Sequence, residues 1–232
     1  MNYKPTSRIG NRPFGLFIRP IFLCRCDEGR FPMATLPRID DIRRNQILQA
    51  AMKTLAKSGS ANVTMEEIAA SCGLSKGGLA HYYPSKSELF MAVFVSFFDG
   101  IFERSCRHML EADHPLEKLL SFSWLFDRND PDCQIGYPLL FDCMALAVHD
   151  EDYRRLLSSW FGNWVTLLKD VIEGGQKQGM FTGIEAEPAA RAISAVYQGM
   201  ATRWYFAPET HDTHWAVEAC RKAIEGIMGD RR

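Results

Sequence analysis

The sequence predicts an all-α protein, on the strength of three observations. From Asp40 onward, apolar residues recur every three or four positions, which places them on one face of a helix. Two capping boxes, Thr64–Glu67 and Ser85–Glu88, mark helix starts, because each hydroxyl can accept from the amide three residues on while the glutamate reaches back. No stretch alternates apolar and polar residues over a useful strand length.

Composition limits the classes of protein to consider. The chain has 232 residues, of which 47% are hydrophobic, enough for one large or two modest domains. A net charge of −1 excludes a globally basic nucleic-acid binder, so any DNA contact must come from a local patch. The seven cysteines are scattered without a CxxC pair, which favours a reducing cytoplasm.

No apolar run approaches the ~20 residues of a membrane-spanning helix, so no membrane partner is expected. The stretch FGLFIRPIFLC is interrupted by Arg19 and Pro20 and lacks a small-residue cleavage site, which argues against a signal peptide.

Residues 1–33 are rich in Arg, Pro and Gly, and we expect a disordered basic arm there. Met33 is a plausible true start of the protein, which would make residues 1–32 an extension. This interpretation is favoured over a basic arm that contacts the DNA backbone.

Residues 34–85 are predicted to form a helix-turn-helix domain. A first helix begins near Asp40 and ends at the SGSAN stretch. A short helix opened by Thr64 ends at Gly73, and a second one, capped by Ser75, ends before Pro84. The tight Gly-Leu-Ser turn between these two short helices is typical of a helix-turn-helix unit.

The pair Gly77-Gly78 lies inside the predicted recognition helix, although glycine costs roughly 0.8–1 kcal/mol relative to alanine in a helix interior. Missing Cβ atoms would let the backbone pass close to sugar and phosphate, and a helix N-terminus suits a phosphate. The alternative is that the two glycines only ease the packing of a tight turn. The residues themselves favour DNA binding.

A run of about fifty residues resembles the N-terminal domain of TetR/AcrR-family transcriptional regulators. The residues that carry the resemblance are Ile47, Leu48, Ala50, Ala51, Leu55, Gly59, Thr64, Ile68, Ala69, Gly73, Leu74, Ser75, Gly78, Leu79, His81, Tyr82, Tyr83, Ser85, Lys86 and Leu89. The resemblance implies a homodimer that binds double-stranded DNA at a near-palindromic operator, with recognition helices about one DNA turn, ~34–36 Å, apart.

The resemblance also implies roles for single residues. Phosphate contacts are implied at Thr64, Tyr82 and Lys86. Base or backbone contacts are implied at Lys76, Gly77, Gly78 and His81, while Leu79 and Tyr83 partly pack the helix. The family commonly has Tyr at the position of Ala80, so that contact is in doubt here. At most, Ala80 would touch a thymine methyl group.

Residues 86–232 are predicted to form a helical ligand-sensing and dimerisation domain, reached by a long helix from Ser85 to about Leu110 in which Gly100 is either a flexing point or a packing contact. The further helices are expected at Leu116–Phe126, Cys133–Val148, Asp152–Gln178, Pro188–Phe206 and Thr213–Met228.

Aromatic residues are unusually dense in this second part, which holds all five tryptophans. The simplest interpretation of any single aromatic residue is that it packs in the hydrophobic core. As a group, however, they exceed what a core of this size needs, and several could line an apolar pocket. The candidate pocket residues are Trp124, Phe141, Met144, Trp160, Trp164, Tyr197, Met200 and Trp204. The resemblance implies that a small-molecule effector, apolar or aromatic, binds here and releases a repressor from DNA. Residues 150–181 resemble the betaine-regulator-like branch more weakly.

The resemblance implies that the last two helices form the homodimer. Small residues line one of them and an apolar stripe lines the other, which suits such an interface. The small or apolar positions are Ala192, Ala195, Val196, Gly199 and Met200 in the first, and Ala216, Val217, Cys220, Ala223, Ile224 and Ile227 in the second.

Other functions receive less support. Cys106/His108 and Cys143/His149 have no supporting catalytic motif, so no enzyme and no cofactor are expected. His211, Asp212 and His214 suggest a metal sensor but read more simply as a loop and helix cap, so no metal site is expected. Cys24, Cys26 or Cys106 would serve a thiol sensor, but no positive cluster favours a lowered thiol pKa. A constitutive DNA-binding dimer without ligand stays open.

Overall fold

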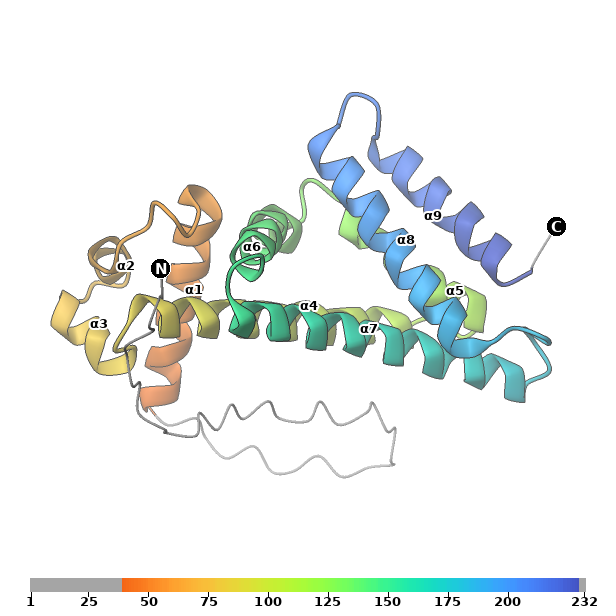
Figure 1. The fold of residues 1–232 in the computed structure, drawn as a ribbon, viewed down its shortest axis with the longest axis horizontal. Coiled ribbons are helices and arrows are strands. Elements are labelled where there is room, and N and C mark those ends of the chain that lie inside the picture. Colours follow the sequence, from red (N-terminus) through yellow and green to blue (C-terminus); the bar gives the residue numbers. More distant parts are fainter. Residues whose placement is uncertain (1–38, 230–232) are drawn as a thin grey trace, which may run out of the picture. The chain divides into compact units, whose positions relative to one another are not determined.

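The computed structural model describes residues 39–229, and the predicted basic arm at residues 1–33 lies outside this range. The described residues contain helices and no strand, which confirms the all-α prediction (Figure 1). The helices are α1 (Ile39–Ser58), α2 (Met65–Ser71), α3 (Lys76–Tyr82), α4 (Lys86–Leu110), α5 (Pro115–Leu120), the 3₁₀ helix η1 (Ser123–Phe126), α6 (Pro131–Ala147), α7 (Glu151–Lys177), α8 (Ala186–Phe206) and α9 (Thr213–Ile227). Between residues 39 and 229, no helix is both long and apolar enough to cross a membrane.

Helices α1, α2 and α3 share a small apolar core. Ile47 and Ala51 of α1, Ile68 of α2 and Leu79 of α3 are fully buried. Two arginines of α1 reinforce this packing from outside the core: Arg43 donates to the carbonyl of Cys72 at 3.1 Å, just after α2, and Arg44 donates to the carbonyl of Tyr82 at 2.9 Å, at the end of α3. Because free carbonyls gather at helix C-termini, these contacts hold the two short helices in place.

Helix α4 connects this trio to the remaining helices, and its 25 residues span about 37 Å. Its buried face carries Phe90, Phe94 and Phe98, and it packs against α1, α5, α6 and α7. A Cβ at Gly100 would meet no heavy atom within 4 Å among the described residues. Of the two alternatives for this glycine, the packing contact finds no support there, and the flexing point stays a prediction.

One predicted helix is broken. Instead of a single helix over Leu116–Phe126, α5 ends at Leu120 and the chain continues as η1. Side chains from later helices take the carbonyls of this segment: Tyr137 donates to Leu125 at 2.7 Å, and Thr213 donates to Phe126 at 2.6 Å. These tertiary bonds replace the backbone bonds of a longer helix, and periodicity cannot reveal them.

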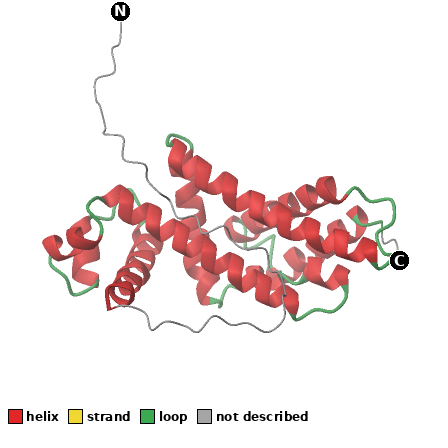
Figure 2. Ribbon diagram, turned by 90° about the horizontal axis from the view of Figure 1, so that it is seen from below, coloured by secondary structure: helices red, strands yellow, loops and turns green. Residues whose placement is uncertain are grey.

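The remaining helix boundaries agree with the predictions to within two residues. Helix α7 packs against α6 and α8, and α8 packs against α9. Figure 2 shows that green loops connect the helices, which are drawn in red. Helix starts follow from local capping, since Asp130, Asp150 and Asp212 each accept from amides of the helix that they precede.

Helix α6 also contacts the N-terminal trio, against α1. The carboxylate of Asp142 in α6 accepts from the backbone N–H of Ser60 at 2.6 Å and from its hydroxyl at 2.8 Å. Ser60 follows α1 and is buried. Charge-assisted hydrogen bonds at these distances are stronger than neutral ones, so they fix α6 to the α1–α2 connection.

Two adjacent glycines near the end of α7 allow a test of how closely this helix packs against the residues that follow it. A Cβ at Gly175 would lie 2.6 Å from Cε2 of Phe181, whereas a Cβ at Gly174 would have no neighbour within 4 Å among residues 39–229. We expect Gly175→Ala to lower the free energy of unfolding by about 1–3 kcal/mol through overpacking. Gly174→Ala, as the control, is expected to raise it by up to about 1 kcal/mol. Urea titration followed by circular dichroism measures both, and equal shifts would contradict the described packing.

Candidate DNA interface and effector cavity

Helix α3 presents a short polar surface next to its capped N-terminus. The hydroxyl of Ser75 accepts from the amide of Gly78 at 3.1 Å, which starts the helix. Lys76, Ala80 and His81 are exposed, and Tyr82 is half-buried with its ring 5.2 Å from that of His81. These residues lie on one short helix and are accessible to a large partner.

Two residues proposed for the interface point the other way. Leu79 is fully buried, which agrees with its expected packing role, but its side chain has no access to DNA, so its place among the DNA-contact residues is corrected. Tyr83 is also buried, and burial raises the pKa of its phenol although Arg44 opposes that rise. The helical period explains the result, because Leu79 and Tyr83 are four residues apart and share the core face of the segment.

The two glycines of α3 are not required by the protein's own packing. Neither Gly77 nor Gly78 has a positive φ. Within the described part of the chain, a Cβ at Gly77 would have no neighbour within 4 Å, and one at Gly78 would make ordinary contacts from 3.4 Å to Ser75 and Leu74. The interpretation that the glycines ease a tight turn therefore finds no support at Gly77. A bare backbone there suits the close approach of something outside the chain.

Thr64 caps α2 through the predicted reciprocal box. Its hydroxyl accepts from the amide of Glu67 at 3.2 Å, and the carboxylate of Glu67 accepts from the amide of Thr64 at 2.7 Å. Thr64 is exposed at the helix N-terminus, where an anion is favoured.

Both predicted lysine contacts have neighbours within the chain. Lys76 forms an ion pair with Glu66 at 2.5 Å, and the hydrogen bond from Lys76 lowers the pKa of that carboxyl. Both side chains are largely exposed, so this pair is weak and can be exchanged for a phosphate. Lys86, in the first turn of α4, lies with its ammonium 5.1 Å from the centre of the Phe90 ring.

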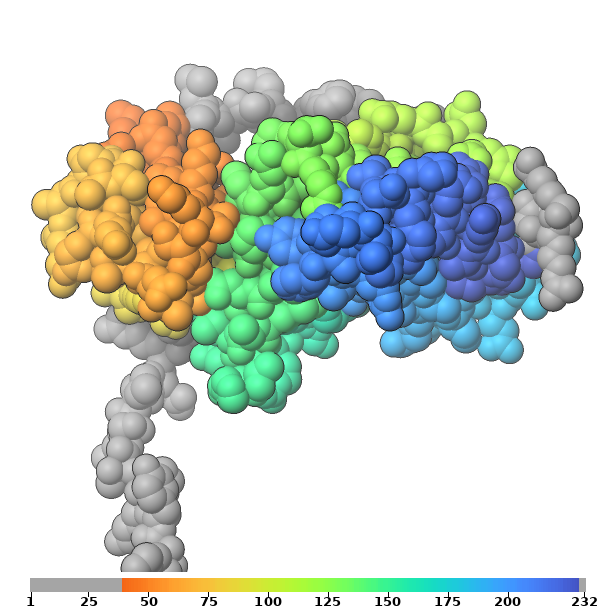
Figure 3. All heavy atoms as spheres, turned by 90° about the horizontal axis from the view of Figure 1, so that it is seen from above, coloured from red at the N-terminus to blue at the C-terminus, as the bar shows by residue number. Residues whose placement is uncertain are grey.

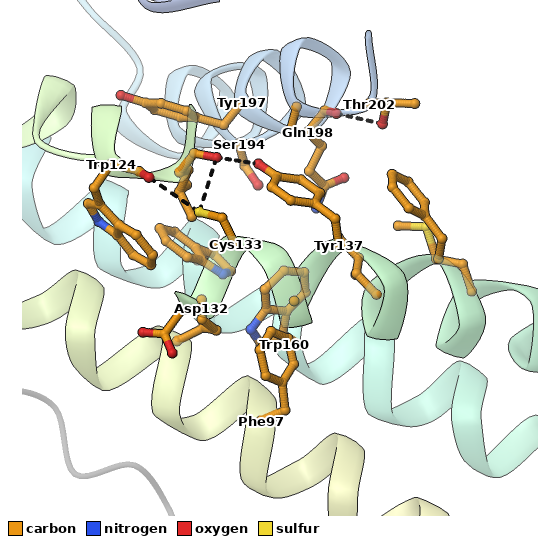
Figure 4. Close-up of a pocket in the computed structure, with 18 of the residues that line it drawn as sticks. Phe97, Trp124, Asp132, Cys133, Tyr137, Trp160, Ser194, Tyr197, Gln198 and Thr202 are labelled. Carbon is orange, nitrogen blue, oxygen red and sulfur yellow. Dashed lines mark hydrogen bonds between the residues drawn. The ribbon is translucent and has the colours of Figure 1, made fainter. Parts of the chain in front are cut away.

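A cavity of about 90 Å³ lies between α4, η1, α6, α7 and α8 (Figure 4). Its walls are mainly aromatic and aliphatic, the character expected of a small-molecule site. The lining residues are Phe97, Ile101, Trp124, Leu125, Asp132, Cys133, Gly136, Tyr137, Leu140, Phe141, Met144, Trp160, Trp164, Leu168, Ser194, Tyr197, Gln198, Ala201 and Thr202.

Most of the predicted pocket residues do line this cavity, namely Trp124, Phe141, Met144, Trp160, Trp164 and Tyr197. Met200 and Trp204 do not: Trp204 is buried, its ring 6.0 Å from that of Phe126, and its indole N–H donates to Thr213. Composition could not separate these core positions from lining ones, because both types of position are apolar.

The polar lining residues went unnoticed in the sequence. Ser194, Gln198 and Thr202 recur at the four-residue spacing of α8, which is the one signal that could have revealed them. Gly136 brings the backbone of α6 close to Phe97, since a Cβ there would lie 2.6 Å from the ring.

Several protons at the cavity wall are already held by backbone carbonyls. Cys133 donates to Trp124 at 3.3 Å, Tyr137 donates to Leu125, and Tyr197 donates to Leu119 at 2.8 Å. Burial raises the pKa of the Cys133 thiol to about 12 and raises the phenol pKa values of Tyr137 and Tyr197. All three groups are therefore neutral and already used as donors.

A charged cluster borders the cavity. Arg104 pairs with Asp130 at 2.6 Å and with Asp132 at 2.7 Å, and its guanidinium lies 3.9 Å from the centre of the Trp124 ring. The hydrogen bond from Arg104 is the main cause of the lowered pKa of Asp130. One guanidinium opposes two carboxylates, so this edge of the cavity carries a net negative charge.

The residues considered for metal or thiol chemistry have other contacts. Asp212 caps α9 by accepting from the amide of Trp215 at 2.7 Å, and the ring of His211 packs edge-on against Trp215. No group of three metal-ligating side chains occurs in the described part of the chain. Cys106 is half-buried, while Cys24 and Cys26 lie outside the described residues.

The helices expected to dimerise are partly used inside the chain. Ala216, Cys220 and Ile224 of α9 are buried within the single chain, so the predicted stripe is not free as a whole. On α8, Ala192 and Ala195 are exposed. Figure 3 shows the surfaces of α8 and α9 side by side on one face, in blue.

Two family models match the chain. Residues 47–93 match the model of bacterial regulatory proteins of the tetR family. Residues 124–229 match the C-terminal model of BetI-type transcriptional repressors. The first match covers α2, α3 and most of α1, and the second covers the segment from η1 to α9.

Whole relatives agree with these matches. The nucleoid occlusion factor SlmA of Marinomonas sp. (strain MWYL1) is 29% identical over 161 residues, which cover 68% of this chain and 80% of that protein. The transcriptional regulator BetI of Stenotrophomonas maltophilia (strain R551-3) is 27% identical over 166 residues, covering 70% and 81%.

Solved structures share the fold. A TetR-family regulator from Rhodococcus sp. has a TM-score of 0.67 at 23% identity, with 80% of this chain and 98% of that chain covered. A transcriptional regulator from Saccharomonospora viridis in complex with choline has a TM-score of 0.71 at 20% identity, with 78% and 95% covered.

Gly77 offers a test in which stability and DNA binding change in opposite directions. We expect Gly77→Ala to raise the free energy of unfolding by up to about 1 kcal/mol, because alanine favours the helix and its Cβ meets no neighbour. The same Cβ is expected to weaken DNA binding about tenfold or more by obstructing the approach of the backbone.

Gly162→Ala in α7 is the matched control, since a Cβ there is also free of neighbours and lies outside α1–α3. It should stabilise the protein and leave DNA affinity unchanged. Thermal unfolding and fluorescence anisotropy with promoter DNA measure the two effects. Unchanged affinity in Gly77→Ala would contradict a close backbone approach.

Proposed function

Since the chain belongs to the TetR family and is a DNA-binding transcriptional regulator rather than an enzyme, we propose that it acts as a homodimeric repressor. It leaves its operator when a small apolar or aromatic molecule occupies the cavity between α4 and α8. The observation that carries the proposal is the combination of an exposed, glycine-bearing recognition helix and an aromatic cavity within one chain. The cytoplasm is the compartment in which such a protein meets DNA.

We assign the DNA contacts to the exposed side of α3 and the two adjacent helix starts. Thr64, Tyr82 and Lys86 contact phosphates, and Lys76 and His81 reach base edges or backbone. Gly77 and Gly78 allow the close approach, while Leu79 and Tyr83 support the helix from below. Arg44 contributes indirectly, because its bond to Tyr82 holds the end of α3.

The homodimer is proposed to form through the surface shared by α8 and α9. Small exposed residues such as Ala192 and Ala195 permit close helix approach. A twofold axis would place two copies of α3 on one side of the dimer, so that they read a near-palindrome.

Two effector classes deserve comparison. The lining supports an apolar or aromatic molecule. A quaternary ammonium cation is the second candidate, because aromatic faces attract such cations, the C-terminal segment matches BetI-type repressors, and one structure with the same fold contains choline. A thiol-responsive, metal-responsive or constitutive regulator has no comparable support in the cavity.

The proposed coupling runs through α6. This helix lines the cavity with Tyr137, Phe141 and Met144. One residue from Phe141, Asp142 holds Ser60 in the α1–α2 connection. An effector that displaces α6 therefore moves the DNA-binding trio, provided that it binds the displaced arrangement more tightly.

Footprinting on the DNA upstream of the protein's own coding region, at two salt concentrations, tests the proposal. Protection of a near-palindrome with half-sites about one turn apart, weakening with salt, is the expected result. Lys86→Met should lower the slope of log affinity against log salt by about 1 per protomer. A protein that protects no site anywhere in its genome would refute the regulator.

The Asp142–Ser60 contact predicts a change in both stability and response. Asp142→Ala leaves a buried amide unsatisfied, so we expect the free energy of unfolding to fall by about 1–3 kcal/mol. Asp142→Asn retains an acceptor and should lose less. Once an effector is known, Asp142→Ala should require more of it to release DNA.

Glu209→Ala, at an exposed position before α9, is the control and should change neither quantity. Urea unfolding and effector titration of the DNA complex provide the measurements. An Asp142→Ala variant with wild-type stability and wild-type release would show that the contact transmits nothing.

A further inference from the structure

We propose that the cavity selects uncharged molecules that carry a hydrogen-bond acceptor, such as aromatic ketones, and that Trp160 and Trp164 donate to that acceptor. The inference rests on the proposed function, because it takes the cavity as the effector site. Hydrogen bonding distinguishes an uncharged aromatic effector from a quaternary ammonium cation, whereas the apolar lining suits both.

The first observation concerns the indole N–H groups. The indole nitrogens of Trp124, Trp160 and Trp164 are buried and have no hydrogen-bond partner among residues 39–229, and all three residues line the cavity. Trp204, which does not line it, donates to Thr213 at 3.1 Å. Burying an unpaired donor costs free energy, so a cluster of such donors at one cavity is what an acceptor-bearing ligand would satisfy.

Trp160 and Trp164 are better placed than Trp124 to donate a hydrogen bond to a ligand in the cavity. Figure 4 shows the nitrogen of Trp160 on the side of its ring toward Asp132, whereas the nitrogen of Trp124 lies on the ring edge away from Trp160. The rings of Trp160 and Trp164 are perpendicular, with centroids 6.1 Å apart. In a perpendicular pair, only one indole N–H can make a weak N–H···π contact with the face of the other ring. At least one of the two donors therefore lacks even this contact.

The other polar groups favour the same ligand. Cys133, Tyr137 and Tyr197 already donate to backbone carbonyls, so their protons are not free for a ligand. Ser194 and Gln198 can both donate and accept, and they add no charge.

The charged cluster at the cavity edge limits the charge that a ligand can carry. The cluster of Arg104 with Asp130 and Asp132 has one positive and two negative groups, which disfavours an anionic ligand. A quaternary ammonium group has no acceptor and would leave both indole donors unpaired. The net negative charge would by itself attract a cation, so hydrogen bonding decides between the two remaining classes: an uncharged carbonyl compound satisfies the indole donors and a quaternary ammonium group does not.

The experiment compares three probes of similar size by calorimetry on the full chain: acetophenone, its hydrocarbon analogue ethylbenzene, and benzyltrimethylammonium. We expect acetophenone to bind most tightly. Trp160→Phe removes the donor and keeps an aromatic ring, so it should weaken acetophenone binding about three- to tenfold and ethylbenzene binding less. Trp164→Phe repeats the test at the second donor.

Trp215→Phe is the control, because Trp215 does not line the cavity, and it should alter none of the affinities. Equal losses for acetophenone and ethylbenzene in Trp160→Phe would overturn the inference, as would tightest binding of benzyltrimethylammonium. Either result leaves the cavity as an effector site. Binding of none of the probes by protein that still protects its operator would instead remove the effector site itself, and the inference with it.

Discussion

The burial of one face of α4 is the constraint on which the rest of the structure depends. Phe90, Phe94 and Phe98 are almost completely removed from water, and the helix packs against α1 at one end and against α5, α6 and α7 along its length. Apolar area of this size cannot be exposed without a large loss of free energy. The DNA-binding trio and the cavity are therefore built on the same helix, and neither can move independently of it.

Helix α6 adds a second connection of a different kind. Its apolar residues form a wall of the cavity, while Asp142 holds Ser60 through two short hydrogen bonds. Hydrophobic contacts tolerate small displacements, but a charged hydrogen bond is lost within a fraction of its length. This difference makes the carboxylate the more sensitive part of the link between the cavity and α1–α3.

At the wall of the cavity, side chains replace regular backbone bonding in η1. Tyr137 and Thr213 hold its carbonyls, which keeps Trp124 and Leu125 at the cavity wall instead of in a continued α5. Those same bonds consume the phenol and hydroxyl donors. The indole N–H groups of Trp124, Trp160 and Trp164 are left buried without a partner among the described residues.

The sequence by itself determined the helices, their capping boxes and the exposed polar residues of α3, because capping and helical periodicity depend on residues three or four positions apart. It also singled out the bare backbone at Gly77. Only the tertiary structure decided that Trp204 belongs to the core while Trp160 lines a cavity, and that α5 gives way to η1. These outcomes depend on contacts such as Thr213 with Phe126, between residues distant in the chain, and no local pattern encodes them.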